Sequence, residues 1–150
     1  DILSTPGTYE RLRDDRSLVP TAVEECLRHR PVVNVLFRRP AEDQMVGDVT
    51  IPAGSTVALG YASANRDETV HECPAEFRLD RSKPRDHLAF GTGPHVCPGA
   101  TLARLEATAM LDALTSRVAA IALVDGFEPE PNPVFWANGH RRLAATLQPA

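Results

Sequence analysis

The sequence predicts one domain of mixed α and β class, with two main helices, short antiparallel hairpins and a long irregular meander. Of its 150 residues, 43% are hydrophobic and 24% are charged, as in globular chains long enough to bury a core. The 13 prolines are spread along the whole chain and divide it into short elements, which argues against a helical bundle. Two segments carry apolar residues at helical spacing, and several shorter ones are β-branched and apolar.

The first strong helix is predicted over residues 20–30. It opens on a proline, which suits the first turn, and Pro31 stops it. Val23 and Leu27 are four residues apart and therefore share one face. The preceding residues 8–16 form a charged stretch that we interpret as the end of a longer helix.

Strands and irregular chain are expected to follow. Val32–Phe37 is β-branched and apolar, which predicts a short buried strand. Residues 46–51 and 56–61 flank Pro52-Ala53-Gly54-Ser55, whose turn chemistry predicts a hairpin. Residues 65–84 are polar and weakly periodic, so we expect a meander there.

The second half is predicted to be a loop, a helix and a β tail. Leu88–Pro98 is rich in glycine and proline, whereas Gly99–Arg117 has the strongest helical pattern. Residues 121–124 read as a strand, and Asn138-Gly139 within residues 134–147 favours a hairpin. The apolar stripe of the helix consists of Leu102, Leu105, Ala109 and Leu111–Leu114.

Composition also excludes several functions. A net charge of −4 and an isoelectric point of about 5.7 argue against binding to a nucleic-acid backbone. No apolar run approaches the roughly 18 residues of a membrane span, and the N-terminus lacks a signal-peptide pattern. Three cysteines favour a reduced, cytoplasmic setting. The chain starts at Asp1 without a methionine, which suggests a fragment or a processed product.

The segment Phe90-Gly91-Thr92-Gly93-Pro94-His95-Val96-Cys97-Pro98-Gly99 carries the chemistry. Cys97 is expected immediately before a helix that begins at Pro98, so that free N–H groups and the helix dipole favour its thiolate. The glycines allow the backbone to fold tightly and to approach a flat group. Such a thiolate is a good axial ligand for haem iron. The alternative for a lone cysteine is a small buried apolar residue.

Other glycine-loop motifs do not fit this segment, because it lacks both the third glycine of a dinucleotide loop and the Gly-Lys-Ser/Thr of a phosphate loop. The pattern Phe90-Gly91-x-Gly93-x-His95-x-Cys97-x-Gly99 resembles the haem-binding signature of the cytochrome P-450 family. Further matching segments are Glu25-Cys26-Leu27-Arg28, Arg38 with Ile51-Pro52-Ala53-Gly54, Ala64-Asn65-Arg66-Asp67, Pro74-Ala75-Glu76-Phe77, His87-Leu88-Ala89-Phe90 and Leu102-Ala103-Arg104-x-Glu106. The resemblance covers nearly the whole chain and is to the C-terminal part of bacterial members.

The resemblance implies roles for the loop residues. Cys97 would be the thiolate ligand of the iron of haem b, and Phe90 would pack near the sulfur on the same face. Gly91 and Gly99 belong to the same haem-binding loop. The resemblance also implies that Arg38 and His95 hold the haem propionates, and His87 is a further candidate for this role.

The resemblance also implies a buried structural pair between Glu25 and Arg28, which lie three residues apart on one helix face. The family often adds an arginine from the meander, just before its phenylalanine, but Glu76 occupies that position here. Arg78 or Arg66 are the candidates to replace it.

Substrate contacts are implied at two places. Val32, Val33 and Asn34 resemble a strand that faces the substrate over the haem, and Trp136 lies in a tail loop that resembles another contact. The alternative for each is an ordinary core position.

The implied activity is that of a haem-thiolate monooxygenase, which uses O2 and two electrons to hydroxylate or epoxidise a small apolar organic substrate. Lys83, Arg85 and Arg104 could face an acidic ferredoxin as the electron donor. The family's distal oxygen-activating helix and its N-terminal part have no counterpart in residues 1–150. We therefore expect this chain alone to be inactive, with the missing part supplied by a separate chain or lost.

Two alternatives remain at this point. The chain could be a non-catalytic remnant that acts as a binding or interaction module. It could also bind zinc through His71-x-Cys73 and His95-x-Cys97, although one intervening residue is tight for a zinc site.

Overall fold

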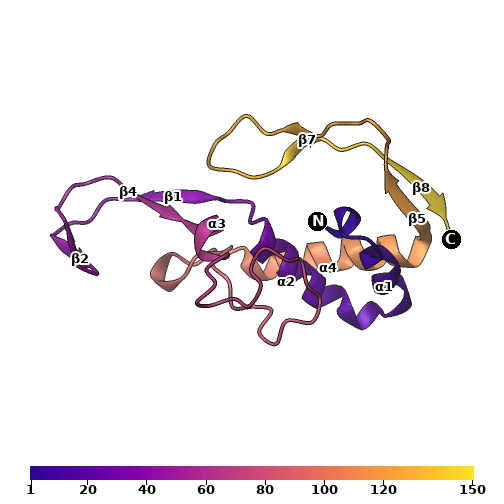
Figure 1. The fold of residues 1–150 in the computed structure, drawn as a ribbon, viewed down its shortest axis with the longest axis horizontal. Helices are drawn as coiled ribbons and strands as arrows, with labels where there is room; N and C mark the ends of the chain where they lie inside the picture. The colour runs from indigo at the N-terminus through magenta and orange to yellow at the C-terminus, as the bar shows by residue number, and fades with distance from the viewer.

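In the computed structural model, which describes residues 1–150, three helices lie together and carry the core (Figure 1). They are α1 (Thr8–Asp14), α2 (Val19–His29) and α4 (Ala100–Arg117). The short helical elements are η1 (Ile2–Ser4), η2 (Arg16–Leu18), α3 (Tyr61–Ala64) and η3 (Gly93–His95). The buried hydrophobic cluster consists of Leu12, Val19, Ala22, Val23, Leu79 and Leu111. The predicted mixed class with two main helices is confirmed.

Helix α2 matches its predicted bounds within one residue. Pro20 lies in its first turn, and Pro31 follows its last. Its apolar side packs on α4, while Glu24, Glu25 and Arg28 are also buried. A helix that buries three charged residues must give each of them a partner, because an unpaired buried charge is costly.

Residues 8–14 are helical, as expected, and form helix α1, but this helix is more than a charged stretch because it also contributes to the core. Tyr9 and Leu12 are buried, and Leu12 belongs to the core cluster. The Tyr9 hydroxyl reaches Leu114 O at 3.1 Å and Val118 O at 3.0 Å. The hydroxyl has one proton to donate, and Leu114 O already accepts from Val118 N–H, so this contact mainly ties α1 to the C-terminal end of α4.

The strands form four antiparallel pairs. Strand β1 (Val35–Arg38) pairs with β4 (Val57–Gly60), and β2 (Gln44–Val46) pairs with β3 (Val49–Ile51). Strand β5 (Val118–Leu123) pairs with β8 (Ala145–Pro149), and β6 (Glu130–Pro131) with β7 (His140–Arg142).

The predicted hairpin between residues 46–51 and 56–61 is wrong. Gly47, at φ +57°, turns the chain back within the first of these segments, so β3 pairs with β2. The second segment then pairs with β1 instead. Strand β1 is also more exposed than expected, since Phe37 is 48% exposed.

Helix α4 begins at Ala100, later than expected. Pro98 and Gly99 form a turn closed by a 3.2 Å hydrogen bond from Ala100 N–H to Cys97 O. The apolar stripe predicted for α4 is only partly correct, because Leu111 is buried whereas Leu102 and Leu105 are 58% and 66% exposed.

The C-terminal tail forms an arm that runs over one side of the helices (Figure 1). Residues 132–139 connect β6 to β7, so Asn138-Gly139 ends a long loop and does not form a two-residue turn. Asn34 N–H donates to Trp136 O at 2.8 Å, and Asn138 N–H donates to Val32 O at 2.6 Å. The tail loop is therefore held against the segment before β1.

Residues 65–92 contain no strand or α-helix, as the predicted meander requires. None of the helices combines the length and the apolar character that crossing a membrane would demand.

Candidate functional site

The loop that carries Cys97 closes on itself. Gly91 N–H donates to Leu88 O at 2.9 Å, and Cys97 N–H donates to Phe90 O at 2.9 Å. Gly91 and Gly93 both have φ +70°, which a residue with a side chain rarely adopts. These turns bring Cys97 back beside Phe90 and leave it exposed.

Glycine is favoured at position 91 by its left-handed backbone and not by a lack of space, because a Cβ there would make only ordinary contacts. A Cβ at this position would come within 3.6 Å of Tyr61 Oη and 3.7 Å of His95 O. At Gly99 a Cβ would lie 3.8 Å from Cys97 Sγ. The glycines therefore keep the surroundings of the thiol free of side-chain atoms.

Cys97 faces an apolar cavity of about 430 Å³. Eight of its ten lining residues are hydrophobic. Six were singled out from the sequence as candidate site residues, namely Val32, Val33, Phe90, Gly91, His95 and Cys97. The other four are Leu27, Leu36, Tyr61 and Ala89.

Those four residues were not identified as site residues from the sequence. Leu27 and Leu36 have the pattern of ordinary core positions, and Tyr61 is brought to the cavity only because β4 pairs with β1. Ala89 lies beside Phe90 and was quoted only as part of the motif. Local sequence cannot distinguish a cavity wall from a core position, since both are apolar.

Five of the haem- and substrate-contact candidates lie outside the lining of this cavity, namely Asn34, Arg38, His87, Gly99 and Trp136. Arg38 ends β1 with its side chain exposed, and its Nη1 donates to Phe37 O at 2.9 Å. Trp136 is 44% exposed and is joined to Asn34 through the backbone. The tail loop therefore holds Asn34 and Trp136, two of the residues expected to contact substrate, next to each other through their backbones.

The Glu25–Arg28 pair is deeply buried, with each side chain 1% exposed. Arg28 Nη2 and Nε lie 2.8 Å from the two carboxylate oxygens, and its remaining donors bind the carbonyls of Asn65, Pro74 and Glu76. This pair therefore joins α2 to the meander.

The third partner of the pair is Arg81, whose Nε lies 2.8 Å from Glu25 Oε2. Arg78 contributes only its backbone N–H to Glu25, and Arg66 binds His29 O instead. Burial alone would raise the pKa of Glu25, but the hydrogen bonds from these groups outweigh it and lower the pKa. Arg81 is far from Glu25 in the sequence, so no local spacing indicated this partner.

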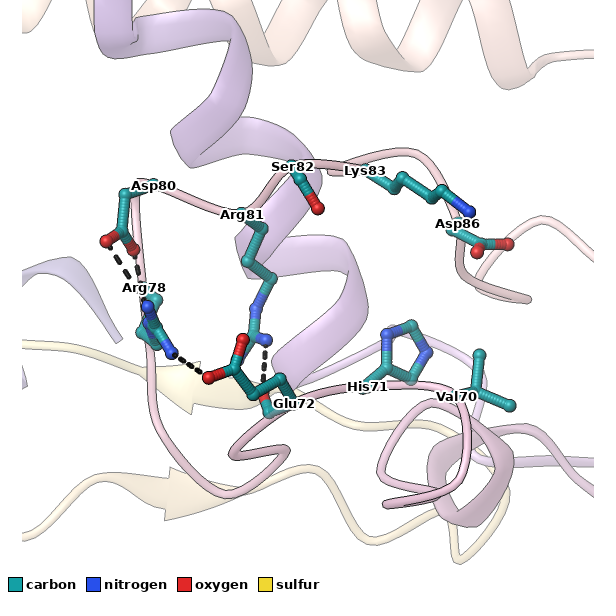
Figure 2. Close-up of a pocket in the computed structure, with 9 residues that line it drawn as sticks. All are labelled: Val70, His71, Glu72, Arg78, Asp80, Arg81, Ser82, Lys83 and Asp86. Atoms are coloured by element: carbon teal, nitrogen blue, oxygen red, sulfur yellow. Dashed lines mark hydrogen bonds and ion pairs between the residues drawn. The ribbon is translucent and has the colours of Figure 1, made fainter.

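Figure 2 shows the outer side of this network, a polar cavity of about 310 Å³ in the meander. Arg81 Nη1 donates to Glu72 O at 2.6 Å, and Arg78 pairs with Asp80 at 3.1 Å. Arg78 and Arg81 therefore also bind groups within the meander, in addition to the bond from Arg81 to Glu25.

His87 is placed against Glu24 of α2. Its Nε2 lies 3.0 Å from Glu24 Oε2, and its side chain is 1% exposed. Glu24 also binds Arg104 at 2.7 Å and Arg85 at 3.2 Å. The haem contact expected of His87 stays a prediction, and two of the three cations expected to face a ferredoxin bind this carboxylate.

The two His-x-Cys pairs do not come together. The structure gathers no group of three or more His, Cys, Asp and Glu side chains that could hold a metal ion. His71 lines the polar cavity, whereas His95 and Cys97 line the apolar one. A four-ligand zinc site from these residues is therefore not supported.

The loop and the cavity belong to a region that matches a known protein family. The family model described as Cytochrome P450 matches residues 8–118. The chain belongs to the cytochrome P450 family.

Several P450 relatives are similar over almost the whole chain. The "Biotin biosynthesis cytochrome P450" of Bacillus subtilis is 38% identical over 98% of the chain, and the "Beta-dihydromenaquinone-9 omega-hydroxylase" of Mycobacterium tuberculosis is 41% identical over 97%. A structure of P450BioI with an acyl carrier protein ligated to hexadec-9Z-enoic acid superposes with a TM-score of 0.92 at 37% identity, over 98% of this chain and 38% of that one. CYP109E1 from Bacillus megaterium with corticosterone gives 0.90 at 34% identity, over 98% and 39%.

The matched region is a minor part of each relative. It covers 37% of the Bacillus protein and 28% of the mycobacterial one. The present chain therefore spans well under half the length of these P450s.

Proposed function

We propose that this chain is the haem-binding part of a P450 monooxygenase, with Cys97 as the ligand of the haem iron. The observation that carries the proposal is the exposed Cys97 thiol on the wall of a mostly apolar cavity of about 430 Å³. Gly91 supports it, because its φ of +70°, which a residue with a Cβ rarely adopts, allows the turn that brings Cys97 to the cavity wall. A soft thiolate beside an apolar, glycine-lined surface suits a flat macrocycle that carries iron.

The other residues would bind and orient the group. Phe90 would pack beside the sulfur, while Gly91 and Gly99 keep the approach open. The cations proposed for the haem propionates are Arg38, His95 and His87. Haem b, when bound, supplies the redox chemistry that inserts one oxygen atom of O2 into a substrate, the other leaving as water after uptake of two electrons and two protons.

We propose a small apolar organic substrate and a ferredoxin-like electron donor. The apolar walls Val32 and Val33, with Asn34 and Trp136 nearby, support the first. The names of two relatives mention a dihydromenaquinone and a hexadecenoic acid ligated to acyl carrier protein, and the apolar character of these molecules, although not a small size, agrees with the proposal. Lys83 is an exposed cation available to an acidic donor, and Arg85 is 76% exposed although its Nε pairs with Glu24. Three free cysteines support the reduced cytoplasm as the location.

The remainder of the enzyme would have to come from the part of the P450 length that this chain does not span. We propose that the chain alone is not a competent monooxygenase and that a segment corresponding to the N-terminal part completes the pocket. A non-catalytic binding module is the alternative, and it requires a chain that folds without haem.

The test is reconstitution with haem, alone and with the N-terminal part of a related P450. The reduced protein is exposed to carbon monoxide and its absorption spectrum recorded. We expect a red-shifted thiolate-type band that C97A abolishes and C73A, at another exposed cysteine, retains. Haem uptake with an identical spectrum in C97A would overturn the proposal, and no uptake in either form would favour the binding module.

A further inference from the structure

Two neighbouring glutamates of α2 hold two different parts of the chain. Glu25 binds Arg28, Arg81 and the backbone of the meander. Glu24 points to another side of the helix and binds groups from the Cys97 loop region and from α4. Consecutive helical residues point about 100° apart, so one turn of α2 serves both segments.

The Glu24 cluster consists of Glu24, Arg85, His87 and Arg104. Glu24 is buried with its side chain 6% exposed, and it accepts bonds at both oxygens. Ala89 N–H donates to His87 Nδ1 at 3.2 Å, which leaves Nε2–H to donate to the Glu24 carboxylate. Burial alone would raise the pKa of Glu24, but hydrogen bonds from Arg104 and His87 outweigh this and lower it, so the carboxylate is charged.

The cluster contacts Phe90 on two sides. The Arg104 guanidinium carbon lies 4.6 Å from the centre of the Phe90 ring, and the His87 ring lies 6.5 Å from it, centre to centre. Arginine over an aromatic face is attractive, and more so when partly shielded from water. Phe90 then holds Cys97 through the 2.9 Å backbone hydrogen bond.

We propose that Glu24 is a positioning residue for the thiol, because it orients Arg104 and His87 against Phe90 and so fixes the loop that presents Cys97. The effect of Glu24 on the position of the loop involves only residues of this chain. Its importance for binding iron rests on the proposed function. Glu24 does not line the cavity and acts only through the other residues.

The test measures the position of the thiol without haem. The folded chain is treated with a maleimide under native conditions, and the labelling rate of each cysteine is followed by peptide mass spectrometry. Cys73 is exposed and lies in the meander, so it is a reference within the same molecule. Burial raises the pKa of the Cys26 thiol to about 11, so Cys26 should react slowest and report unfolding.

Cys97 is already exposed, so its labelling rate reports how firmly the loop holds the sulfur. We expect E24Q to speed labelling of Cys97 relative to Cys73 by only about two- to threefold through weaker charge-assisted bonds to the loop. R104K keeps the positive charge but loses the planar group over Phe90, and it should raise the same ratio. E106Q, which removes an exposed glutamate of α4, should leave the ratio unchanged. In an F90A background E24Q should add little.

Equal rates in E24Q and E106Q would overturn the inference. So would a rise that Cys73 and Cys26 share, because it would report general loosening. If E24Q does not fold, R104K decides alone, since Arg104 is 26% exposed and less critical to the core. Haem uptake is measured separately with the same variants. A failed reconstitution therefore counts against the proposed function, while the labelling ratio still decides the role of Glu24.

Discussion

Arginine–carboxylate pairs with the same chemistry occur in this chain at two extremes of burial. Arg28 and Glu25 are each 1% exposed, whereas Arg16 and Asp112 are 50% and 43% exposed. In both pairs an arginine Nη2 lies within 2.9 Å of a carboxylate oxygen. The distance is thus nearly constant, and the surroundings determine the energetic contribution.

We predict that R28A lowers the free energy of unfolding by about 3–5 kcal/mol, because it leaves Glu25 buried without its main partner and the carbonyls of Asn65 and Pro74 without their side-chain donor. R16A should cost only about 0–1 kcal/mol. Urea unfolding of both variants measures the difference. Similar costs for the two would show that the buried network does not connect α2 to the meander.

At the scale of elements, α4 has two unlike faces. Leu111 is buried against α1 and α2, while Leu102, Leu105 and Met110 are 58%, 66% and 64% exposed. The sequence pattern assigned Leu102 and Leu105 to the same stripe as Leu111, because apolar spacing shows a face and not whether anything in this chain covers it.

We predict that L111A lowers the free energy of unfolding by about 2–5 kcal/mol, since it removes buried methyl groups and leaves a cavity. L105A, with the same chemical change on the exposed face, should change it by less than about 0.5 kcal/mol. Thermal or urea unfolding of the isolated chain compares the two. An equal loss in L105A would mean that this face is covered in solution.

At the scale of the whole molecule, buried ionisable groups couple stability to pH. Burial lowers the pKa of His71 and of His87, although Glu24 opposes the effect at His87. Glu24 and Glu25 also have lowered pKa values, because hydrogen bonds to arginine and histidine outweigh the opposite effect of burial. In each case the unfolded chain takes up the proton first as pH falls, so acid favours unfolding.

We therefore predict that the urea midpoint falls as pH drops from about 7 to about 5, where histidines titrate, and falls further below about pH 4.5 as the glutamates protonate. H87Q should flatten the first part of the profile, while H140Q, at an exposed position, should not. A midpoint that rises between about pH 7 and about pH 5 would contradict the burial of these histidines in the folded state.

Features that depend on near neighbours could be predicted without the structure: helix α2 between its prolines, the glycine loop that carries Cys97, and the Glu25–Arg28 pair three residues apart on one helix. Local sterics and helical spacing are sufficient for these. Three long-range contacts became visible only in the folded chain: β4 pairs with β1, Arg81 completes the buried pair, and Glu24 connects to Phe90 through Arg104. These partners are separated by tens of residues, and their contacts exist only once the meander and α4 have packed on α2, so no local pattern encodes them.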